Sequence, residues 1–369
     1  MRQNNIIPPI DPRIIRSELH EQLMLRKTNR AKNELYTFHA NEAPNTMLEI
    51  GRLREEAFRA GGGGTGKAAD IDELDLRPNG YQQLVVWDPE AQQILGGYRY
   101  ILCKNAIEQQ PDGTYHTHLS SGEIFQFDPL FIKEYLPKTI ELGRSFVTVE
   151  NQNTALGGTK SRLPRSIFTL DNLWDGLGAL MLLHDDCQYF FGKVTMYQSY
   201  NTKARDLIYY YLDTYFTPKL PLVTSKYPIE YHTPIEQLRQ IIIGQDHKKD
   251  YKSMSHAIRE MGTTIPPLVN TYIGLSEALM VFGSSYNPFF GDVLETAIMI
   301  PMEEITPEKK KRHINSFLRD APQTLSGRVL QRIKQRLLRL NRHHEPESDQ
   351  PKQGLSLIHI SEPTRHLRI

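Results

Sequence analysis

Four short polar motifs between residues 54 and 144 carry the side chains most capable of chemistry. In chain order they are Arg54-x-x-x-Phe58, Asp72-Glu73-Leu74-Asp75, Gly96-Gly97-Tyr98-Arg99 and Glu141-Leu142-Gly143-Arg144-Ser145-Phe146. Each motif places charged side chains inside apolar, structured sequence, where an unpaired charge costs several kcal/mol or more. One such motif would be explained by a structural ion pair. Four in this order predict the lining of a site.

The last motif has the residue types that acyl transfer needs. In a regular strand Glu141 and Arg144 would point to opposite faces, but Gly143 between them is where a bulge could form. A bulge re-aims side chains and exposes a backbone N–H, which can bind a thioester carbonyl oxygen while the acid takes a proton from an amine. The alternative is a buried Glu–Arg pair that holds the sheet together.

The first two motifs have a structural and a functional interpretation. Arg54 and Phe58 share a helix row with Ile50, so Arg54 is partly buried and needs an anion, which Asp72 or Asp75 would supply. Clustered acids are otherwise usually solvated, although carboxylates also attract and orient an ammonium group. The nearby run from Gly61 to Lys67 is not a phosphate loop, because Ala68 replaces the required Ser or Thr and the run follows a helix.

Composition excludes several other classes. A net charge of +1 gives no overall basic footprint for nucleic acid, although the stretch from Lys309 to Arg342 is cationic. The two cysteines are far apart, and the histidines match no metal spacing, so we expect neither a disulfide framework nor a metal site. No run is long and apolar enough to span a bilayer, and no signal peptide is evident, so we expect a cytoplasmic protein.

The elements that position the motifs alternate between helix and strand, which favours a mixed α/β sheet. We predict helices over 9–30, 47–60, 170–183, 204–216 and 325–340, and strands over 36–39, 83–87, 94–102, 139–149, 189–196 and 293–302. The segment 244–253 is expected to be a polar connection. Residues 355–369 look like translated sequencing-adapter read-through and are left out of fold reasoning.

The four motifs, in this order and at these separations, resemble the GNAT-superfamily branch of acyltransferases that use acyl carrier protein thioesters. This branch includes hemolysin-like N-acyltransferases that make ornithine and glycine lipids, and it is related to acyl-homoserine-lactone synthases. Three further segments look like the hemolysin-like members: Leu173-Trp174-Asp175-Gly176-Leu177, Phe191-Gly192-Lys193-Val194 and Ile265-Pro266-Pro267-Leu268. The resemblance covers roughly residues 35–305 and implies a GNAT-like mixed, mostly antiparallel central sheet flanked by helices.

The resemblance implies transfer of a long acyl chain, with or without a 3-hydroxyl group, to the α-amine of glycine or ornithine. Glu141 would be the base, with Gly143 and Arg144 beside it, and the substrate-binding residues would be Arg54, Asp72, Asp75 and Arg99. The acyl chain would contact Phe58, Phe125, Phe127 and Phe146, and acyl carrier protein would meet Lys160, Arg162 and Arg165. No cofactor is expected. Residues 155–160 only loosely resemble a diphosphate-gripping loop, which favours a carrier-protein donor over coenzyme A.

These expectations define the domain organisation and leave two alternative functions. We expect an N-terminal helical extension over 1–35, the GNAT-like domain over 36–305, a basic amphipathic helical tail over 306–345 and disorder over 346–369. The helix over 325–340 would contact the inner face of the membrane peripherally or, equally, pack on its own domain. The rival functions are an acyl-homoserine-lactone synthase and a non-catalytic protein that binds acyl carrier protein or lipid.

Overall fold

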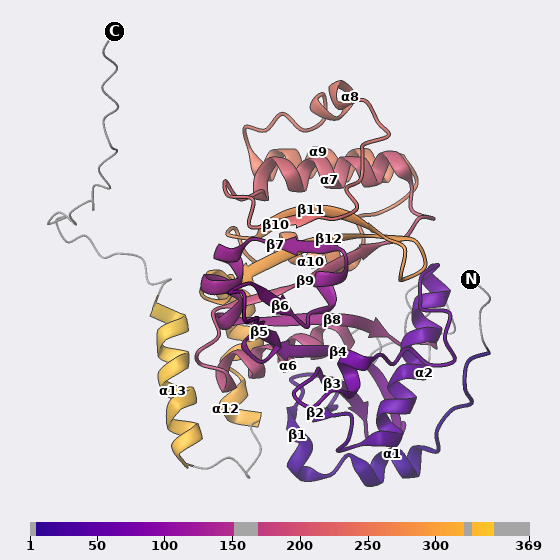
Figure 1. The fold of residues 1–369 in the computed structure, drawn as a ribbon, viewed down its shortest axis with the longest axis vertical. Helices are drawn as coiled ribbons and strands as arrows, with labels where there is room; N and C mark the ends of the chain where they lie inside the picture. The colour runs from indigo at the N-terminus through magenta and orange to yellow at the C-terminus, as the bar shows by residue number, and fades with distance from the viewer. Residues whose placement is uncertain (1–4, 151–168, 321–326, 343–369) are drawn as a thin grey trace, which may run out of the picture.

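The computed structural model describes residues 5–150, 169–320 and 327–342 (Figure 1). At its centre is an eight-stranded sheet in the order β1-β2-β3-β4-β8-β9-β12-β11. Its strands are β1 (Met24–Lys27), β2 (Glu34–His39), β3 (Gln82–Asp88), β4 (Gln93–Leu102), β8 (Thr139–Val147), β9 (Tyr189–Met196), β12 (Val293–Pro301) and β11 (Met280–Asn287). Neighbouring strands are antiparallel except β8 and β9, which run parallel. This confirms the predicted mixed, mostly antiparallel sheet.

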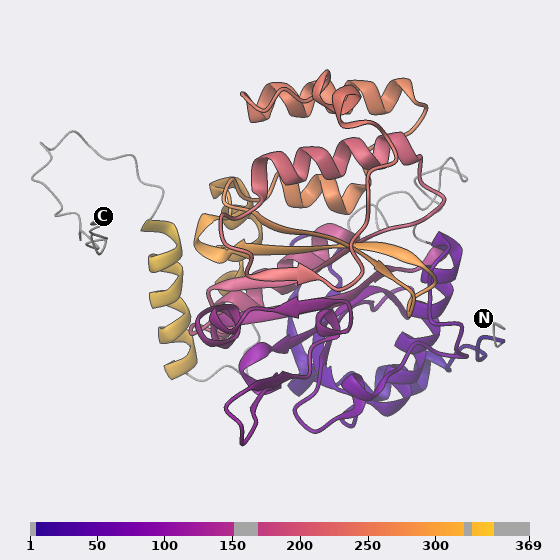
Figure 2. The ribbon, with the colours of Figure 1, turned by 45° about the horizontal axis from the view of Figure 1, so that its top comes forward.

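Helices cover both faces of the sheet. One face packs against α6 (Thr169–Leu183), α7 (Thr202–Phe216) and α10 (Pro267–Ile273) in the larger core cluster, and α9 (His247–Glu260) packs on α7. Figures 1 and 2 both show α7 and α9 side by side at the β11 end of the molecule. The other face packs against α2 (Pro44–Gly61), which α1 (Pro12–Glu18) contacts.

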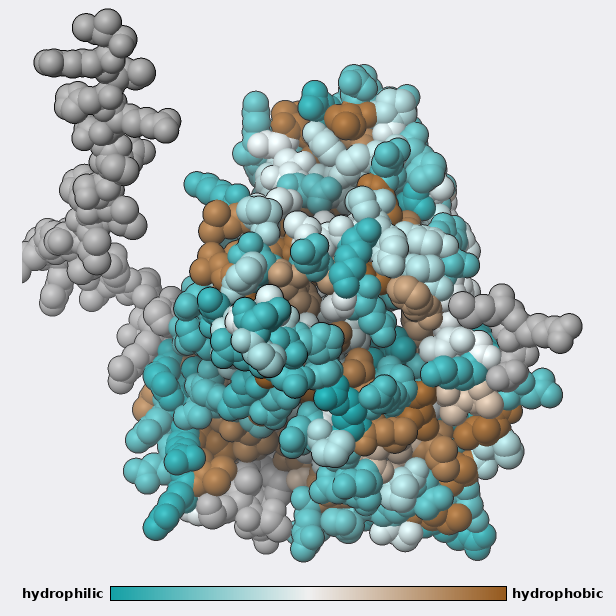
Figure 3. Space-filling view, viewed as in Figure 1, coloured by the Kyte–Doolittle hydropathy of each residue, from teal (hydrophilic) through white to brown (hydrophobic). Residues whose placement is uncertain are grey.

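An insert between β4 and β8 covers the rest of this second face. Its strands pair with each other and with a later segment: β5 (Ile107–Gln109) pairs with β6 (Tyr115–Thr117), and β7 (Phe125–Phe127) pairs with β10 (Val223–Ser225). Phe131 packs its ring against Phe191 and Phe282 of the sheet, and Phe125 is buried in the same cluster. The outer surface of the insert is mainly hydrophilic (Figure 3). The insert therefore closes the sheet over the region where the last polar motif lies.

The pairing of β8 breaks at two places, and both breaks lie at the fourth motif. The parallel pairing with β9 ends at Leu142 opposite Gly192. In the antiparallel pairing with β4, Gly143 still faces Arg99, but Arg144 and Ser145 together lie opposite one residue of β4. The bulge is therefore one residue later than predicted, and Arg144 carries it with a φ of 49°. Beyond Leu142, the two central strands have no paired residues.

The sequence prediction was wrong in two segments. Residues 9–30 do not form one helix: α1 ends at Glu18, a 3₁₀ turn follows, and β1 joins the edge of the sheet. The segment 244–253 is not only a polar connection, because α9 begins at His247 and buries Met254 and Ile258.

Helix α13 (Gly327–Arg342) packs its apolar side on its own domain, against α6. Ile333, Leu337 and Leu340 are buried, and the buried guanidinium of Arg336 donates to the Cys187 carbonyl at 2.7 Å. Only Leu338 of its large apolar side chains is strongly exposed, at 61%. Peripheral membrane contact through the outer side remains a prediction, which vesicle flotation would test. No helix in the described ranges is long and apolar enough to cross a membrane.

Candidate functional site

Three arginines and three aspartates form a chain of alternating charge between α2 and the sheet. Arg54 of α2 lies 3.4 Å from Asp75, and both side chains are fully buried. Arg99 of β4 lies 3.1 Å from Asp75 and 2.8 Å from Asp72. A turn of helix, α3 (Glu73–Leu76), holds the two aspartates in place, because each carboxylate accepts from the other's backbone N–H. Asp75 is therefore not a solvated acid.

The bulge in β8 places Arg144, the third arginine, in this network. Arg144 lies 2.8 Å from buried Asp70 and 3.7 Å from Asp72, and its guanidinium lies 4.3 Å from the ring centre of Phe290. In a regular strand, Arg144 would point away from Glu141. The left-handed backbone at Arg144 instead turns its side chain toward α2, on the same side of the sheet.

Burial and charge set the protonation of this network. Burial alone would raise the pKa of Asp75, but the charges of Arg99 and Arg54 outweigh it and lower that pKa. For Asp70 burial outweighs the charge of Arg144, so its pKa is raised. The guanidinium groups of Arg54 and Arg99 already pair with aspartates inside the protein. Arg144 and Asp72 keep side-chain exposures of 16% and 24%, so these two members are the ones positioned to meet a substrate.

Glu141 is buried on the same face of the sheet. Its Oε1 accepts from the Ser120 hydroxyl at 2.9 Å and from the Ser121 backbone N–H at 3.1 Å. Its Oε2 is also buried and has no hydrogen-bond partner among the described residues. Burial raises the pKa of Glu141, and Lys193 offsets part of that rise. A buried carboxylate with one free oxygen and a raised pKa is suited to accept a proton.

A second ion pair continues the polar row beyond Glu141. Lys193 of β9 lies 2.9 Å from Glu295 of β12 and donates to the Ser120 carbonyl at 3.2 Å. Asn287 of β11 donates to the same Glu295 at 2.6 Å. None of these residues was predicted as part of the site. Lys193 and Glu295 carry the signal used above, a charge inside an apolar strand, whereas neutral Ser120 and Ser121 carry no such signal.

A narrow pocket opens where β8 and β9 separate. Its volume is about 30 Å³, and it is lined by residues of both faces of the sheet. The lining residues include Tyr98, Leu142, Gly143, Ser145, Phe190, Gly192, Lys193 and Tyr272. Glu141 itself does not line it but precedes Leu142 and Gly143, which do. Glu141 and the pocket therefore both lie where the parallel pairing of β8 and β9 ends.

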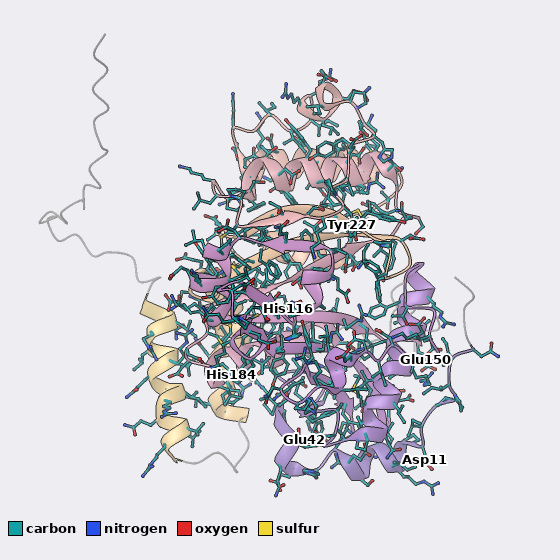
Figure 4. The ribbon with its side chains drawn as sticks, viewed as in Figure 1. Asp11, Glu42, His116, Glu150, His184 and Tyr227 are labelled. Carbon is teal, nitrogen blue, oxygen red and sulfur yellow. The ribbon has the colours of Figure 1, made fainter. Side chains whose placement is uncertain are left out.

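The four phenylalanines predicted to bind the acyl chain lie in two separate clusters. Phe58 of α2 packs in one cluster with Phe146 of β8, whereas Phe125 and Phe127 of the insert pack in another. None of the four lines the pocket, so a shared acyl tunnel remains a prediction. Lys160, Arg162 and Arg165 lie outside the described residues. Glu150, the last described residue before that gap, lies next to α2 in Figure 4.

A larger cavity, of about 350 Å³, lies at the ends of β2, β3 and β4, and Glu141 is not among its lining residues. It is lined by polar side chains that include His39, Gln82, Tyr100 and His184. Figure 4 places His184 and His116 on different elements. The described ranges contain no group of three or more His, Cys, Asp or Glu side chains arranged to hold a metal ion.

Comparison with known proteins identifies the class to which this fold and site belong. Residues 53–157, which contain all four motifs, match the family model of the acetyltransferase (GNAT) domain. The chain is 48% identical over 320 residues to a glycine N(alpha)-acyltransferase of Phocaeicola vulgatus, covering 87% of this chain and 95% of the relative. It is 47% identical over 320 residues to a protein of the same name from Bacteroides thetaiotaomicron, covering 87% and 92%. No solved structure gives a significant match.

The chain is thus an acyltransferase with a GNAT domain. More particularly, it belongs to the family of these two glycine N(alpha)-acyltransferases, because the similarity extends over nearly their whole length.

Proposed function

We propose that the protein transfers a long acyl chain from acyl carrier protein to the α-amine of glycine, as a step in making an amino-acid lipid. The observation that carries this proposal is the free, buried Oε2 of Glu141 beside the open end of the β8–β9 pair. The names of the two relatives support glycine as acceptor, and ornithine is the alternative acceptor. Both chains with a 3-hydroxyl group and chains without one are candidate donors.

The reaction exchanges a thioester for an amide. The glycine ammonium loses a proton to Glu141, and the resulting amine attacks the thioester carbonyl carbon. Backbone N–H groups of β8 beyond Leu142 bind the carbonyl oxygen as negative charge develops on it. The C–S bond then breaks, the leaving thiolate takes up one of the two protons released from nitrogen, and the other passes through Glu141 to solvent. The products are an N-acylglycine and the free carrier thiol.

The charged ends of the acceptor need partners other than the internal ion pairs. Arg144 and Asp72 retain solvent exposure at the edge of the network, so in this proposal Arg144 binds the glycine carboxylate and Asp72 attracts its ammonium group. Arg54, Asp75 and Arg99 fix these two residues. A small acceptor fits because the insert and α2 both close over this face.

A reconstituted assay tests the proposal. Purified protein is incubated with acyl carrier protein or coenzyme A carrying the same acyl chain, and with glycine, ornithine or S-adenosylmethionine in separate reactions. Product masses should show N-acylglycine, formed faster from the carrier-protein donor. A lactone product would support the synthase instead, and binding of acyl carrier protein without thioester consumption would support a non-catalytic role. Either result contradicts the proposal.

A further inference from the structure

Tyr81, which directly precedes β3, is a fully buried residue that contacts three separate parts of the site. Its backbone N–H donates to the Leu74 carbonyl of α3 at 2.9 Å. Its ring lies against Arg99, with 4.5 Å between the guanidinium carbon and the ring centre. Its hydroxyl oxygen accepts from the Ser120 backbone N–H of the insert at 3.0 Å. Tyr81 therefore joins the network of arginines and aspartates to the insert that holds Glu141.

The hydroxyl of Tyr81 completes the start of a short helical turn. Ser120 and Ser121 are the first two residues of the 3₁₀ turn η3 (Ser120–Glu123), and N–H groups at the start of a helix have no acceptor within it. The residue before the turn caps it with no side-chain hydrogen bond. The N–H of Ser120 donates instead to Tyr81, and the N–H of Ser121 donates to Glu141. The tyrosine and the carboxylate thus hold neighbouring groups of the same turn.

Ser120 is the link between Tyr81 and Glu141. Its hydroxyl donates to Glu141 Oε1 at 2.9 Å, its carbonyl accepts from Lys193 at 3.2 Å, and its N–H donates to Tyr81. A serine hydroxyl can rotate, so the backbone of Ser120 has to be held if the hydroxyl is to stay on one carboxylate oxygen. Without the Tyr81 oxygen, the Ser120 N–H would be buried with no acceptor, and the turn would move away from Glu141 to satisfy it.

We propose that Tyr81 is a positioning residue for acyl transfer: its hydroxyl fixes the turn that begins at Ser120, and this turn orients Glu141 toward the amine. The inference rests on the proposed function, because it takes Glu141 as the base. Tyr81 acts through Ser120 and not on the reacting atoms.

The same contacts link Tyr81 to the protonation of Glu141. The hydrogen bonds from Ser120 and Ser121 lower the pKa of Glu141 against the opposite effect of burial, because donors stabilise the ionised carboxylate. The other charged or titratable groups beside Glu141 include Lys193 of β9, Arg99 of β4, Tyr81 itself and Cys103 directly after β4. Removing the Tyr81 hydroxyl leaves Lys193 and Arg99 in place but weakens the two serine bonds, so the pKa of Glu141 should rise.

The test measures the pH dependence of kcat/KM for glycine in Tyr81→Phe, with acyl-loaded carrier protein as donor. The phenylalanine ring keeps the contact with Arg99 and removes only the hydroxyl. Turnover should fall by about 10-fold, as for the loss of one buried hydrogen bond, and the acidic limb should move to higher pH. Tyr100→Phe is the matched control, because Tyr100 is also buried but its hydroxyl bonds Thr37 and Gln82. It should leave turnover and the acidic limb unchanged.

A second variant tests whether Tyr81 acts through Ser120. Ser120→Ala should move the acidic limb in the same direction, and the double variant should lose less activity than the product of the two single losses. Because Ser120→Ala leaves Tyr81 in place, its acidic limb tests the inference even if Tyr81→Phe does not fold.

Three results would overturn this inference: an unmoved acidic limb in Tyr81→Phe or Ser120→Ala, single losses that multiply in the double variant, or an equal response in Tyr100→Phe. Failure of the proposed function itself is distinguishable, since wild-type protein would then form no N-acylglycine from carrier protein or coenzyme A donors.

Discussion

At the scale of single residues, the chemistry depends on how Glu141 is held. One carboxylate oxygen is fixed by Ser120 and Ser121, and the other is left free. Burial raises the pKa of this carboxyl group, while the neighbouring Lys193 limits the rise. A base with a raised pKa binds the proton more firmly, yet it still has to be ionised in the resting enzyme.

The pH dependence of activity should report this balance. The acidic limb of kcat/KM for glycine should lie above the pKa of about 4.3 of an ordinary glutamate. Lys193→Met removes the positive charge that lowers the Glu141 pKa, so the limb should move to higher pH. Lys193→Arg keeps the charge and should leave the limb in place. An unmoved limb in the methionine variant, or equal shifts in both variants, would contradict the role of Lys193.

The buried ion pairs make a separate prediction about stability. Asp75→Asn leaves Arg54 and Arg99 short of a buried counter-charge, so urea unfolding should show a loss of about 3–5 kcal/mol. Because the Asp75 pKa is lowered in the folded protein, this loss should be complete at neutral pH and shrink as the pH falls below about 3.9. Glu73→Gln, at an exposed position of the same short helix, is the control and should have little effect. A loss independent of pH would contradict the assignment.

At the scale of elements, the site depends on where β8 and β9 stop pairing. Gly192 forms the last pair with Leu142, and a Cβ atom there would lie 2.6 Å from the Leu142 carbonyl oxygen. A Cβ atom at Gly143, by contrast, would meet nothing closer than 3.6 Å. Gly192 is thus required because the backbone of β8 lies too close for a side chain, whereas Gly143 has room for one.

This contrast predicts different outcomes for two alanine variants. Gly192→Ala should push the strands apart, destabilise the protein by about 1–3 kcal/mol and reduce turnover. Gly143→Ala should fold with near wild-type stability. Chemical denaturation of both variants provides the measurement. Equal stability of the two variants would show that the end of the strand pair is not tightly set.

The sequence predicted most of this arrangement because charges inside apolar strands and helices are expensive. That rule found Arg54, Asp75, Arg99 and Glu141, and applied to β9 and β12 it would also have found Lys193 and Glu295. It could not find Ser120, which is neutral and reaches Glu141 from a separate insert. The strand β1 was missed because four residues are too few for a periodic pattern, and α9 because its helix buries few apolar side chains.

At the scale of the whole molecule, the C-terminal helix is part of the folded domain. The apolar side of α13 lies on α6. Lys310, which precedes α13 in the chain, donates to the carbonyl of Leu340 near the end of α13 at 2.7 Å. Its outer side carries Arg328, Arg332, Lys334 and Arg339, all exposed. The helix is thus anchored internally and presents its positive charge outward.

Two neighbouring leucines test this packing. Leu337 is buried and Leu338 is 61% exposed. Leu337→Ala should therefore lower the free energy of unfolding by about 2 kcal/mol or more, whereas Leu338→Ala should change it little. Equal effects in urea unfolding would mean that α13 does not pack as described.

The most direct test of the whole account is the rate of acyl transfer after Glu141→Gln. This variant keeps the shape and the contacts to Ser120 and Ser121 but cannot take up the amine proton. Turnover of acyl carrier protein thioester to N-acylglycine should fall by about 10²- to 10⁴-fold while the far-ultraviolet circular dichroism spectrum stays unchanged. Glu123→Gln, on the exposed side of the same 3₁₀ helix as Ser120, should retain wild-type turnover. A folded Glu141→Gln protein with near wild-type turnover would contradict the central claim that this carboxylate is the base.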